Sequence, residues 1–521
     1  MNKSKRIIAL LLSLAMTLCL FAGCNKKEAD KASSEKTFVF GDTTFNAENE
    51  EATANPHDTY CGWACIRYGI GETLFKFNDK MELEPWLATD AHIVDGTDNL
   101  VWEIILRDGV KFSSGRVMDG AAVQECFQDL IDNHERAAGD LSIVEMANDG
   151  QKLWIRTAEP KPTLINYLCD PYGCVIDVQA GVSEDGIPVG TGPYVGKELV
   201  TDDHLDLVKN PDYWNGTVNI DKITVRTISD GDTLALALQK GDIDAAYGMA
   251  YASYPTFTND DYQFSSTATS RSFYCQMNYA SPVIGDPAVR KAIAMGINKE
   301  GFVNTLLDGY GYTATGAFPD TFSYGGNNLT TEKYDAAAAK QLLEEAGWVD
   351  TNGDGIREKN GQNLTIRWVT YPSRQELPLL AESAQQTLRE IGIDVQINST
   401  ADHNTIVADK TQWDVYAAAF VTCGIGDPMY FFTTHCLDDS SKNRGGYHND
   451  QLQVLAEQMN NTFDTNARGD LAVQMQQTIL DDNAFVFCSF LRMSMISKSN
   501  VKGLTAHACD YYELTAELDI E

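Results

Sequence analysis

The stretch Leu106-Arg-Asp-Gly-Val-Lys-Phe112 predicts two β-strands joined by a turn, because it follows an apolar–polar alternation that begins near residue 101. Such alternation predicts β-strands, and an Asp-Gly pair between two apolar runs is typical of a tight turn that joins antiparallel strands. A second stretch, Gly190-Thr-Gly-Pro-Tyr194, puts two glycines and a proline into one short loop. A loop of this composition suits a sharp turn between two lobes.

Outward from these stretches, strand and helix patterns mix along the whole chain. Strand-like alternation covers residues 37–45, 221–228 and 393–397, and helical spacing of apolar residues covers 120–133, 231–240, 335–346, 377–391, 450–461 and 465–480. Gly241, Gly347 and Gly392 follow three of these helices, where glycine is a common stop signal. The mixture, with no fixed repeat, predicts α/β architecture in several lobes.

Size, charge and motifs narrow the class of protein. The chain has 521 residues, more than one hydrophobic core usually serves, so we expect two or more lobes. Its formal net charge of −34 argues against nucleic acid as a partner. The twelve cysteines show no zinc-site spacing, so we expect most of them to be buried thiols, with one or two disulfides as the alternative. No Gly-x-Ser-x-Gly, His-Glu-x-x-His or P-loop motif occurs, and the sequence predicts neither an enzyme nor a cofactor.

The N-terminus has the layout of an export signal. A cationic head with Lys3, Lys5 and Arg6 precedes an apolar run that is shorter than a membrane-spanning helix. The run ends at Ala22-Gly23-Cys24, which looks like a bacterial lipobox, so residues 1–23 are predicted to be a lipoprotein signal peptide and Cys24 to carry a lipid. Residues 24–36 would then be a flexible tether to the membrane. The alternative is an ordinary signal peptide with an incidental cysteine.

Nine segments of the body resemble, in their order and spacing, the extracellular solute-binding proteins of family 5, which serve peptide, dipeptide and nickel ABC importers. They are Asn55-Pro56-His57; Glu72-Thr-Leu-Phe75 before Pro85-Trp-Leu-Ala88; Leu106 to Phe112 with Gly115; Gly190 to Tyr194; Asn210-Pro-Asp-Tyr-Trp214; Gly241-Asp-Ile-Asp244; Pro287-Ala-Val-Arg-Lys-Ala-Ile293 with Asn298-Lys299; Tyr334-Asp335 with Leu342-Leu-Glu-Glu-Ala-Gly-Trp348; and Asp427-Pro428. None of these motifs is catalytic, and they mark a scaffold.

The resemblance implies a two-lobed, periplasmic-binding-protein-like fold of type II that closes around a cleft. Lobe I would comprise residues 37–75, 184–275 and 485–521, with an extra subdomain over 76–183, and lobe II would comprise 276–484. Two crossing strands near 273–278 and 485–490 would act as the hinge. Ligand binding would close the lobes and bury the solute.

The resemblance also suggests how a ligand is held. In peptide-binding relatives an aspartate upstream of the Asp-Pro pair holds the α-amino group of the peptide, but that position falls on Gly424 here. Asp427 is the nearest carboxylate, and its alternative role is a turn residue before Pro428. Arg136 falls on the pocket arginine of nickel-binding relatives, where a guanidinium would clamp a carboxylate of a metal chelate. The alternative is a solvated arginine at a helix end.

Two further features bear on metals. His435, followed by Cys436, is the one candidate near the position of a histidine ligand in nickel-binding relatives, although it could equally be a chance histidine. Asp350-Thr-Asn-Gly-Asp-Gly355 offers oxygens at positions 1, 3 and 5 of a calcium loop, but Gly361 stands at position 12, where a bidentate glutamate is needed. We predict a turn there.

The other ligand candidates are aromatic or cationic residues in segments expected at the cleft. They are Tyr60 and Trp63 after the Asn-Pro-His turn, Arg271 and Tyr274 beside the first hinge strand, and Tyr371 and Arg374 in the loop after a strand. Aromatic side chains at such positions can stack on a ligand, but they belong more often to a hydrophobic core.

Together these features predict the substrate-binding component of an ABC importer, which captures extracellular peptides and delivers them to a membrane permease with its ATPase. The alternatives are a binding protein for chelated nickel or another small solute, and a ligand sensor that is not coupled to transport. The protein is expected to be a monomer, lipid-anchored on the extracellular face of the cell membrane (the periplasmic side in a Gram-negative cell).

Overall fold

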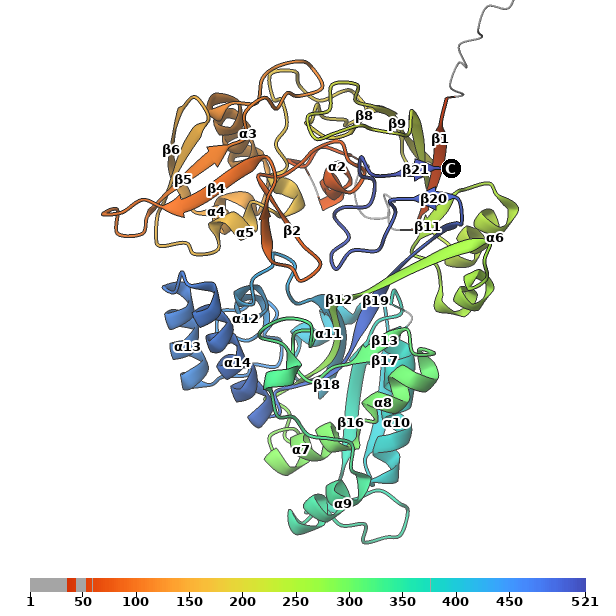
Figure 1. Cartoon of the computed structure of the whole chain (residues 1–521). Coiled ribbons are helices and arrows are strands. Elements are labelled where there is room, and N and C mark those ends of the chain that lie inside the picture. The colour runs from red at the N-terminus through yellow and green to blue at the C-terminus, as the bar shows by residue number, and fades with distance from the viewer. Residues whose placement is uncertain (1–34, 44–52, 59, 375) are drawn as a thin grey trace, which may run out of the picture. The chain divides into compact units, whose positions relative to one another are not determined.

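Two long antiparallel strands, β12 (Tyr262–Met277) and β19 (Phe485–Lys498), run through the middle of the fold (Figure 1). The structure is a computed structural model that describes residues 35–43, 53–58, 60–374 and 376–521. The predicted signal peptide and Cys24 lie outside the described residues. Residues Thr37–Glu521 form one compact unit.

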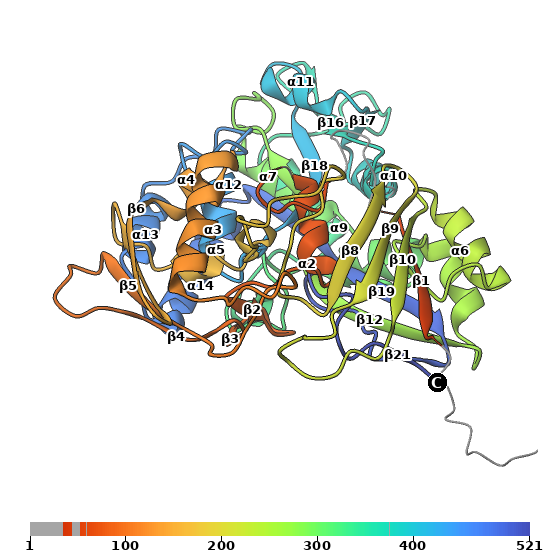
Figure 2. The same cartoon turned by 90° about the horizontal axis from the view of Figure 1, so that it is seen from above.

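The central strands belong to an 11-stranded sheet in the order β17-β16-β18-β12-β19-β11-β1-β10-β9-β8, with β13 (Gly311–Thr313) added on β19. On one side lie β18 (Val415–Val421), β16 (Thr365–Thr370) and β17 (Asp394–Ser399). On the other side lie β11 (Ala245–Tyr247), β1 (Thr37–Asp42), β10 (Lys222–Thr227), β9 (His204–Lys209) and β8 (Tyr194–Val200). Figure 2 shows β8, β9, β10 and β1 side by side. The two halves are the lobes of the predicted two-lobed fold.

Helices complete each lobe. In lobe I, α6 (Gly231–Lys240) packs with β11, and Asp230 caps its first turn by accepting a hydrogen bond from the Thr233 amide at 2.7 Å. In lobe II, a separate hydrophobic core gathers α7 (Pro287–Gly296), α9 (Ala336–Glu345) and α10 (Glu376–Glu390). The predicted helices match these bounds within one residue because each has a clear apolar face and most have a capping side chain.

The extra subdomain is a four-stranded antiparallel sheet with the order β4-β5-β7-β6, covered by α3 (Gly120–Asn133). Its strands are β4 (Ala88–Ile93), β5 (Val101–Leu106), β6 (Ile143–Asp149) and β7 (Lys152–Thr157). The predicted hairpin around Asp108-Gly109 is wrong: β4 and β7 occupy both edges of β5, so residues 110–113 cannot pair with it. The turn itself is present, with Gly109 at a φ of 79°.

Shorter elements connect these parts. The helices are α2 (Ala64–Arg67), α4 (Ala137–Leu141), α5 (Leu164–Tyr167), α8 (Lys299–Gly301), α11 (His403–Ala408), α12 (Met429–His435), α13 (Asp450–Asn460) and α14 (Thr465–Asp481), with 3-10 or π turns η1 (Tyr60–Trp63), η2 (Pro171–Gly173), η3 (Tyr251–Phe257), η4 (Phe302–Leu306) and η5 (Gly326–Asn328). The short strands are β2 (Phe75–Phe77), β3 (Leu83–Pro85), β14 (Glu358–Lys359), β15 (Gln362–Asn363), β20 (Val501–Lys502) and β21 (Asp519–Ile520).

Three of the sequence motifs meet at one buried carboxylate. Glu72 accepts hydrogen bonds from Thr191 Oγ1 at 2.8 Å, from the Tyr213 hydroxyl at 2.7 Å and from Trp214 Nε1 at 2.7 Å. Burial raises the pKa of Glu72 to about 7. Gly192, from the same loop as Thr191, has no room for a side chain, because a Cβ there would collide with the Gly69 carbonyl. These motifs therefore hold lobe I together, in agreement with the expectation that they mark a scaffold.

Two further predictions about the described residues can be checked. Nine cysteines between Cys65 and Cys509 are buried free thiols, as predicted. Residues 350–355 form a turn between Val349 and Glu358, which pair as an isolated bridge. In the described part of the chain, no helix combines the length and the apolar character that crossing a bilayer requires.

Candidate functional site: a cationic cleft between the lobes

Two adjoining cavities lie where the lobes meet. The first has a volume of about 330 Å³ and is lined by lobe I, the extra subdomain and lobe II. The second has a volume of about 670 Å³ and extends toward α6 and the loop before α10. Trp63, Arg67, Arg271, Met493 and Asp510 line both cavities, which makes them parts of one space. We call this space the cleft.

An irregularity in the central strands turns Arg271 into the cleft. The pairing of β12 with β19 is interrupted between Ala268 and Ser272. Inside the interruption, Thr269 donates a hydrogen bond from Oγ1 to the Leu491 carbonyl at 2.9 Å, and the Arg271 amide donates to Thr269 Oγ1 at 3.2 Å. Bulges of this kind re-aim side chains next to binding sites, and both Thr269 and Arg271 line the first cavity.

Arg67 organises the lobe I wall of the cleft. Its buried guanidinium lies 3.7 Å from the centre of the Trp63 ring and forms an ion pair with Asp510. Its Nε donates to the Asp510 carbonyl at 2.7 Å, and Asp42 lies behind it at 3.4 Å. Burial alone would raise the pKa of Asp510, but the charges of Arg67, Arg271 and Arg374 lower it. Asp510 is therefore an ionised carboxylate surrounded by three arginines.

Positive charge exceeds negative charge in the first cavity. Its described lining residues include four cations, Arg67, Arg136, Arg271 and Lys442, and two carboxylates, Asp170 and Asp510. Asp510 is paired with Arg67, and Asp170 is paired with Arg136 at 3.3 Å. Among the described residues, Arg271 and Lys442 form no ion pair, although Lys442 lies 4.2 Å from the centre of the Phe420 ring.

The second cavity adds Arg374 and Arg492, but among its described lining residues four arginines are matched by four carboxylates. The charge of Arg271, followed by burial, lowers the pKa of Arg374, so the two guanidinium groups repel one another across the cleft. Asp230, Asp232 and Glu376 also line this cavity. A ligand carboxylate between Arg271 and Arg374 would relieve the repulsion, because guanidinium groups bind carboxylates bidentately.

Comparisons with known proteins agree with this architecture. The family model of the bacterial extracellular solute-binding proteins, family 5 (middle), matches residues 82–443. The chain belongs to this family. Nickel-binding protein NikA of Staphylococcus aureus is 27% identical over 408 residues, which cover 78% of this chain and 80% of that protein. Oligopeptide-binding protein AppA of Bacillus subtilis is 24% identical over 97% of each chain.

A solved structure gives the same result for the fold. A nickel ABC transporter protein from Bacillus halodurans superimposes with a TM-score of 0.81 at 29% identity, covering 93% of this chain and all of that one. The solute-binding family therefore accounts for the two lobes, the extra subdomain and the position of the cleft between them.

Four of the residues predicted to contact ligand line the cleft of this solute-binding protein. Trp63 and Arg271 line both cavities, Arg136 lines the first and Arg374 lines the second. Tyr60 begins η1, the turn that carries Trp63, and its side chain lies outside the described part. The structure thus brings together candidates from lobe I, the subdomain, the central strand and lobe II.

Asp427 lies behind the cleft wall, with both carboxylate oxygens occupied. Its Oδ2 accepts from Arg468 Nε at 2.8 Å and its Oδ1 accepts from Arg468 Nη2 at 2.6 Å. Oδ1 also accepts the Met429 amide at 2.8 Å, which fits the alternative interpretation of Asp427 as a turn residue. By contrast, Gly424 lines the first cavity, so the position predicted for an amino-group anchor is at the cleft but carries no side chain.

His435 and Tyr274 lie in an aromatic cluster with Phe431, outside the lining of the cleft. The Tyr274 hydroxyl lies 2.9 Å from His435 Nε2, and Thr434 Oγ1 lies 2.7 Å from its Nδ1. Burial, with the charges of Lys442 and Arg444, holds the pKa of His435 well below 6.5. With both ring nitrogens engaged, His435 has no free position for a metal in this conformation.

Tyr371 also has a partner outside the cleft. Its hydroxyl accepts a hydrogen bond from the Ala419 amide at 3.1 Å, and its ring stacks on His403 with centroids 4.2 Å apart. It supports β18, the strand whose end carries Phe420 and Val421 into the first cavity.

Several residues of the cleft were not predicted from the sequence. These are Arg67, Tyr172, Phe420, Tyr430, Lys442, Asp510 and Tyr511. A basic residue in a short helix and an acidic residue near the C-terminus carry no local signal that they meet, since 443 positions separate Arg67 from Asp510. The adjacent tyrosines Tyr511 and Tyr512 are a weak sequence signal for a ligand-binding surface. In the structure, the Tyr511 hydroxyl donates to the Gly424 carbonyl at 3.4 Å.

Proposed function

We propose that this protein captures a small carboxylate-bearing solute, with short peptides as the leading class, and presents it to the permease and ATPase of an ABC importer. The observation that supports the proposal is the cationic cleft. In a chain with a net charge of −34, Arg271 and Lys442 line the first cavity of the cleft and form no ion pair with any described residue. Such a space concentrates anionic ligands and repels cations of similar size.

The lining residues suit a ligand that has a carboxylate at one end, an ammonium group at the other and an apolar part between them. Arg271 and Arg374 would hold a carboxylate, with Lys442 nearby. Asp510, which is ionised, would accept an ammonium group in place of the missing side chain at Gly424. Trp63, Phe420 and Tyr430 provide flat surfaces for apolar side chains.

A chelate of nickel with a carboxylate-bearing amino acid is the second candidate substrate. Two observations favour it: Arg136 lines the cleft, and the Staphylococcus aureus and Bacillus halodurans relatives bear nickel in their names. His435 would not supply a metal ligand there, because it lies behind Phe420, whose ring centroid is 4.3 Å away. The arginines would then bind the carboxylates of the chelator.

Closure about β12 and β19 is the proposed mechanism of capture. Arg271 stands on β12 in the central sheet, whereas Arg67 belongs to lobe I and Arg374 to lobe II. A ligand that bridges them makes more contacts in the closed state than in the open state and so shifts the population toward closure. No covalent chemistry is proposed. The protein would act as a monomer, anchored through a lipid on Cys24 to the extracellular face of the cell membrane. Its lobes would have the boundaries predicted from the sequence.

A thermal-shift screen tests this proposal. The protein is unfolded and refolded to remove bound ligand, and then mixed with di- to octapeptides, free amino acids, and Ni²⁺ with and without histidine. A ligand at about 100 times its Kd adds roughly 2.7 kcal/mol of stability, which raises the Tm by a few degrees in a chain of this size. A shift with peptides supports the leading class, and a shift only with nickel and histidine together supports the second. No shift with any carboxylate-bearing compound would contradict the proposal.

A further inference from the structure

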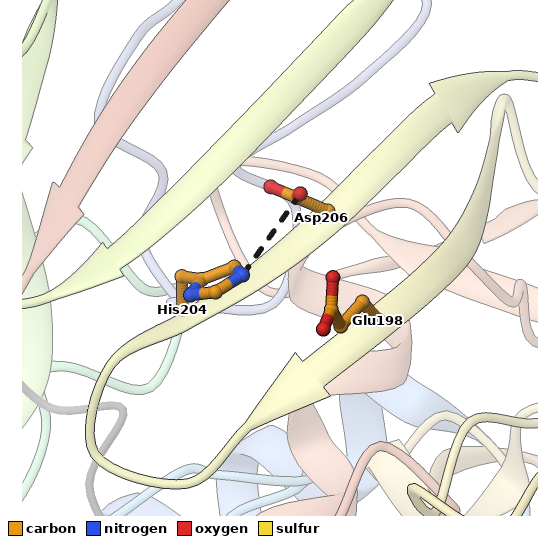
Figure 3. Close-up of side chains that lie close together, drawn as sticks. All are labelled: Glu198, His204 and Asp206. Carbon is orange, nitrogen blue, oxygen red and sulfur yellow. Dashed lines mark ion pairs between the residues drawn. The ribbon is translucent and has the colours of Figure 1, made fainter.

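A second cluster of ligand-type side chains lies on the β8–β9 hairpin, among residues that do not line the cleft. Glu198 on β8 and His204 and Asp206 on β9 each offer one nitrogen or oxygen, and these atoms all lie within 4.8 Å of one another (Figure 3). Glu198 and Asp206 are direct partners in the strand pairing. Because side chains alternate along a strand, His204 projects from the same face as Asp206.

Neighbouring groups orient two of the three side chains. His204 Nδ1 lies 3.0 Å from Asp203 Oδ2, so an Nδ1–H that donates to Asp203 leaves the lone pair on Nε2, which faces Asp206 at 3.9 Å. Asp206 Oδ1 accepts a hydrogen bond from Thr224 Oγ1 at 2.7 Å. In metal proteins, a ligating histidine donates its other N–H to a carboxylate and ligating carboxylates are themselves hydrogen-bonded.

Electrostatics also favours a cation at this place. Like charges directly opposite one another in a strand pair destabilise a sheet, and Glu198 faces Asp206. Arg226 on β10 stands opposite His204 in the strand pairing, and its side chain is exposed. A divalent ion between the carboxylates would remove their repulsion. The His204 side chain is 23% exposed, so water can reach the remaining coordination positions.

The donor set selects the class of metal. One imidazole nitrogen with two carboxylate oxygens suits Zn²⁺, Ni²⁺ or Co²⁺, whereas Ca²⁺ and Mg²⁺ take oxygen ligands alone. We propose that Glu198, His204 and Asp206 bind a divalent transition-metal ion, with water completing the coordination. Ligands on one Zn²⁺ lie roughly 3.4 Å apart at bond lengths of about 2.1 Å, so modest side-chain rotations close the site.

Calorimetric titration of the metal-free protein with Zn²⁺ tests this inference. Wild type should bind one more equivalent than His204→Ala and Glu198→Gln, or bind it at least tenfold more tightly. Asp354→Asn is the matched control, because Asp354 belongs to the other acidic cluster, with Asp350 and Glu358, which contains no histidine. It should leave the titration unchanged. With Co²⁺, wild type and Asp354→Asn should show visible ligand-field absorption that the His204 variant lacks.

The outcomes separate this site from the cleft. Arg271→Gln, which changes the cleft, should bind the same number of Zn²⁺ equivalents as wild type in the calorimetric titration. If wild type, His204→Ala and Glu198→Gln show the same stoichiometry and affinity, the three side chains bind no metal ion, and the inference is wrong.

Discussion

Replacing Asp427 with asparagine should destabilise the protein strongly and leave ligand binding intact. The Asp427 and Arg468 side chains are 9% and 6% exposed and meet through two hydrogen bonds of 2.8 and 2.6 Å. Removing one charge of a buried pair costs about 3–5 kcal/mol, because the other charge stays buried without its counterion. Arg468 would keep the carbonyls of Met459 at 2.6 Å and Thr462 at 3.0 Å, so we expect about 3 kcal/mol.

Equilibrium unfolding in urea, followed by circular dichroism, measures this loss for Asp427→Asn. Glu332→Gln is the matched control: it breaks an exposed pair with Lys291 at 3.0 Å, which should contribute at most about 1 kcal/mol. Titration with the best ligand of the thermal-shift screen completes the test. A loss as small as that of the control would refute the buried-pair argument. A tenfold loss of affinity at unchanged stability would return Asp427 to the ligand site.

Three further predictions concern stability and its dependence on pH. Glu72→Ala leaves one buried donor, Thr191, and two half-buried donors, Tyr213 and Trp214, without their acceptor. It should lower the free energy of unfolding by at least about 2 kcal/mol in urea, and a change below about 1 kcal/mol would contradict this stabilising role of the hydrogen bonds. Because the pKa of native His435 lies well below 6.5, the unfolded state takes up a proton that the native state does not. The contribution of His435 to stability is therefore fully present above about pH 6.5 and is lost below it by up to about 1.4 kcal/mol per pH unit. His435→Gln should flatten the urea-midpoint profile between roughly pH 6.5 and 5, and an identical slope would show that His435 is not the titrating group. Gly192→Ala should cost more than about 2 kcal/mol by the same assay, because its Cβ would collide with the Gly69 carbonyl, and a neutral result would mean that the loop can relax.

Local patterns predicted the elements whose causes are local. The helix expected over residues 120–133 has those bounds, because its apolar face lies within the segment and its capping residue, Asp119, directly precedes it. The hairpin at Asp108-Gly109 was predicted wrongly, because the partners of β5 are chosen by the rest of the sheet and not by the turn. Turn chemistry therefore fixed the bend without fixing the pairing.

The residues of the candidate site also divide into those that local sequence patterns predict and those that depend on distant parts of the chain. Arg136 and Trp63 were found because they follow motifs with a known place in the family fold. Asp427 was placed at the ligand because the sequence does not show that Arg468 folds back onto it across 41 positions. The wall formed by Arg67 and Asp510 exists only in three dimensions, and no spacing rule could reveal it.

A calorimetric comparison of trialanine with its C-terminal amide tests most directly whether the cleft recognises a ligand carboxylate. Wild type should bind the acid at least tenfold more tightly than the amide, and Arg271→Gln should remove this preference. Arg389→Gln, a surface variant whose side chain is 51% exposed, should behave as wild type. Equal affinity of wild type for the acid and the amide, with binding of both, would contradict the claim that the cationic cleft recognises carboxylates.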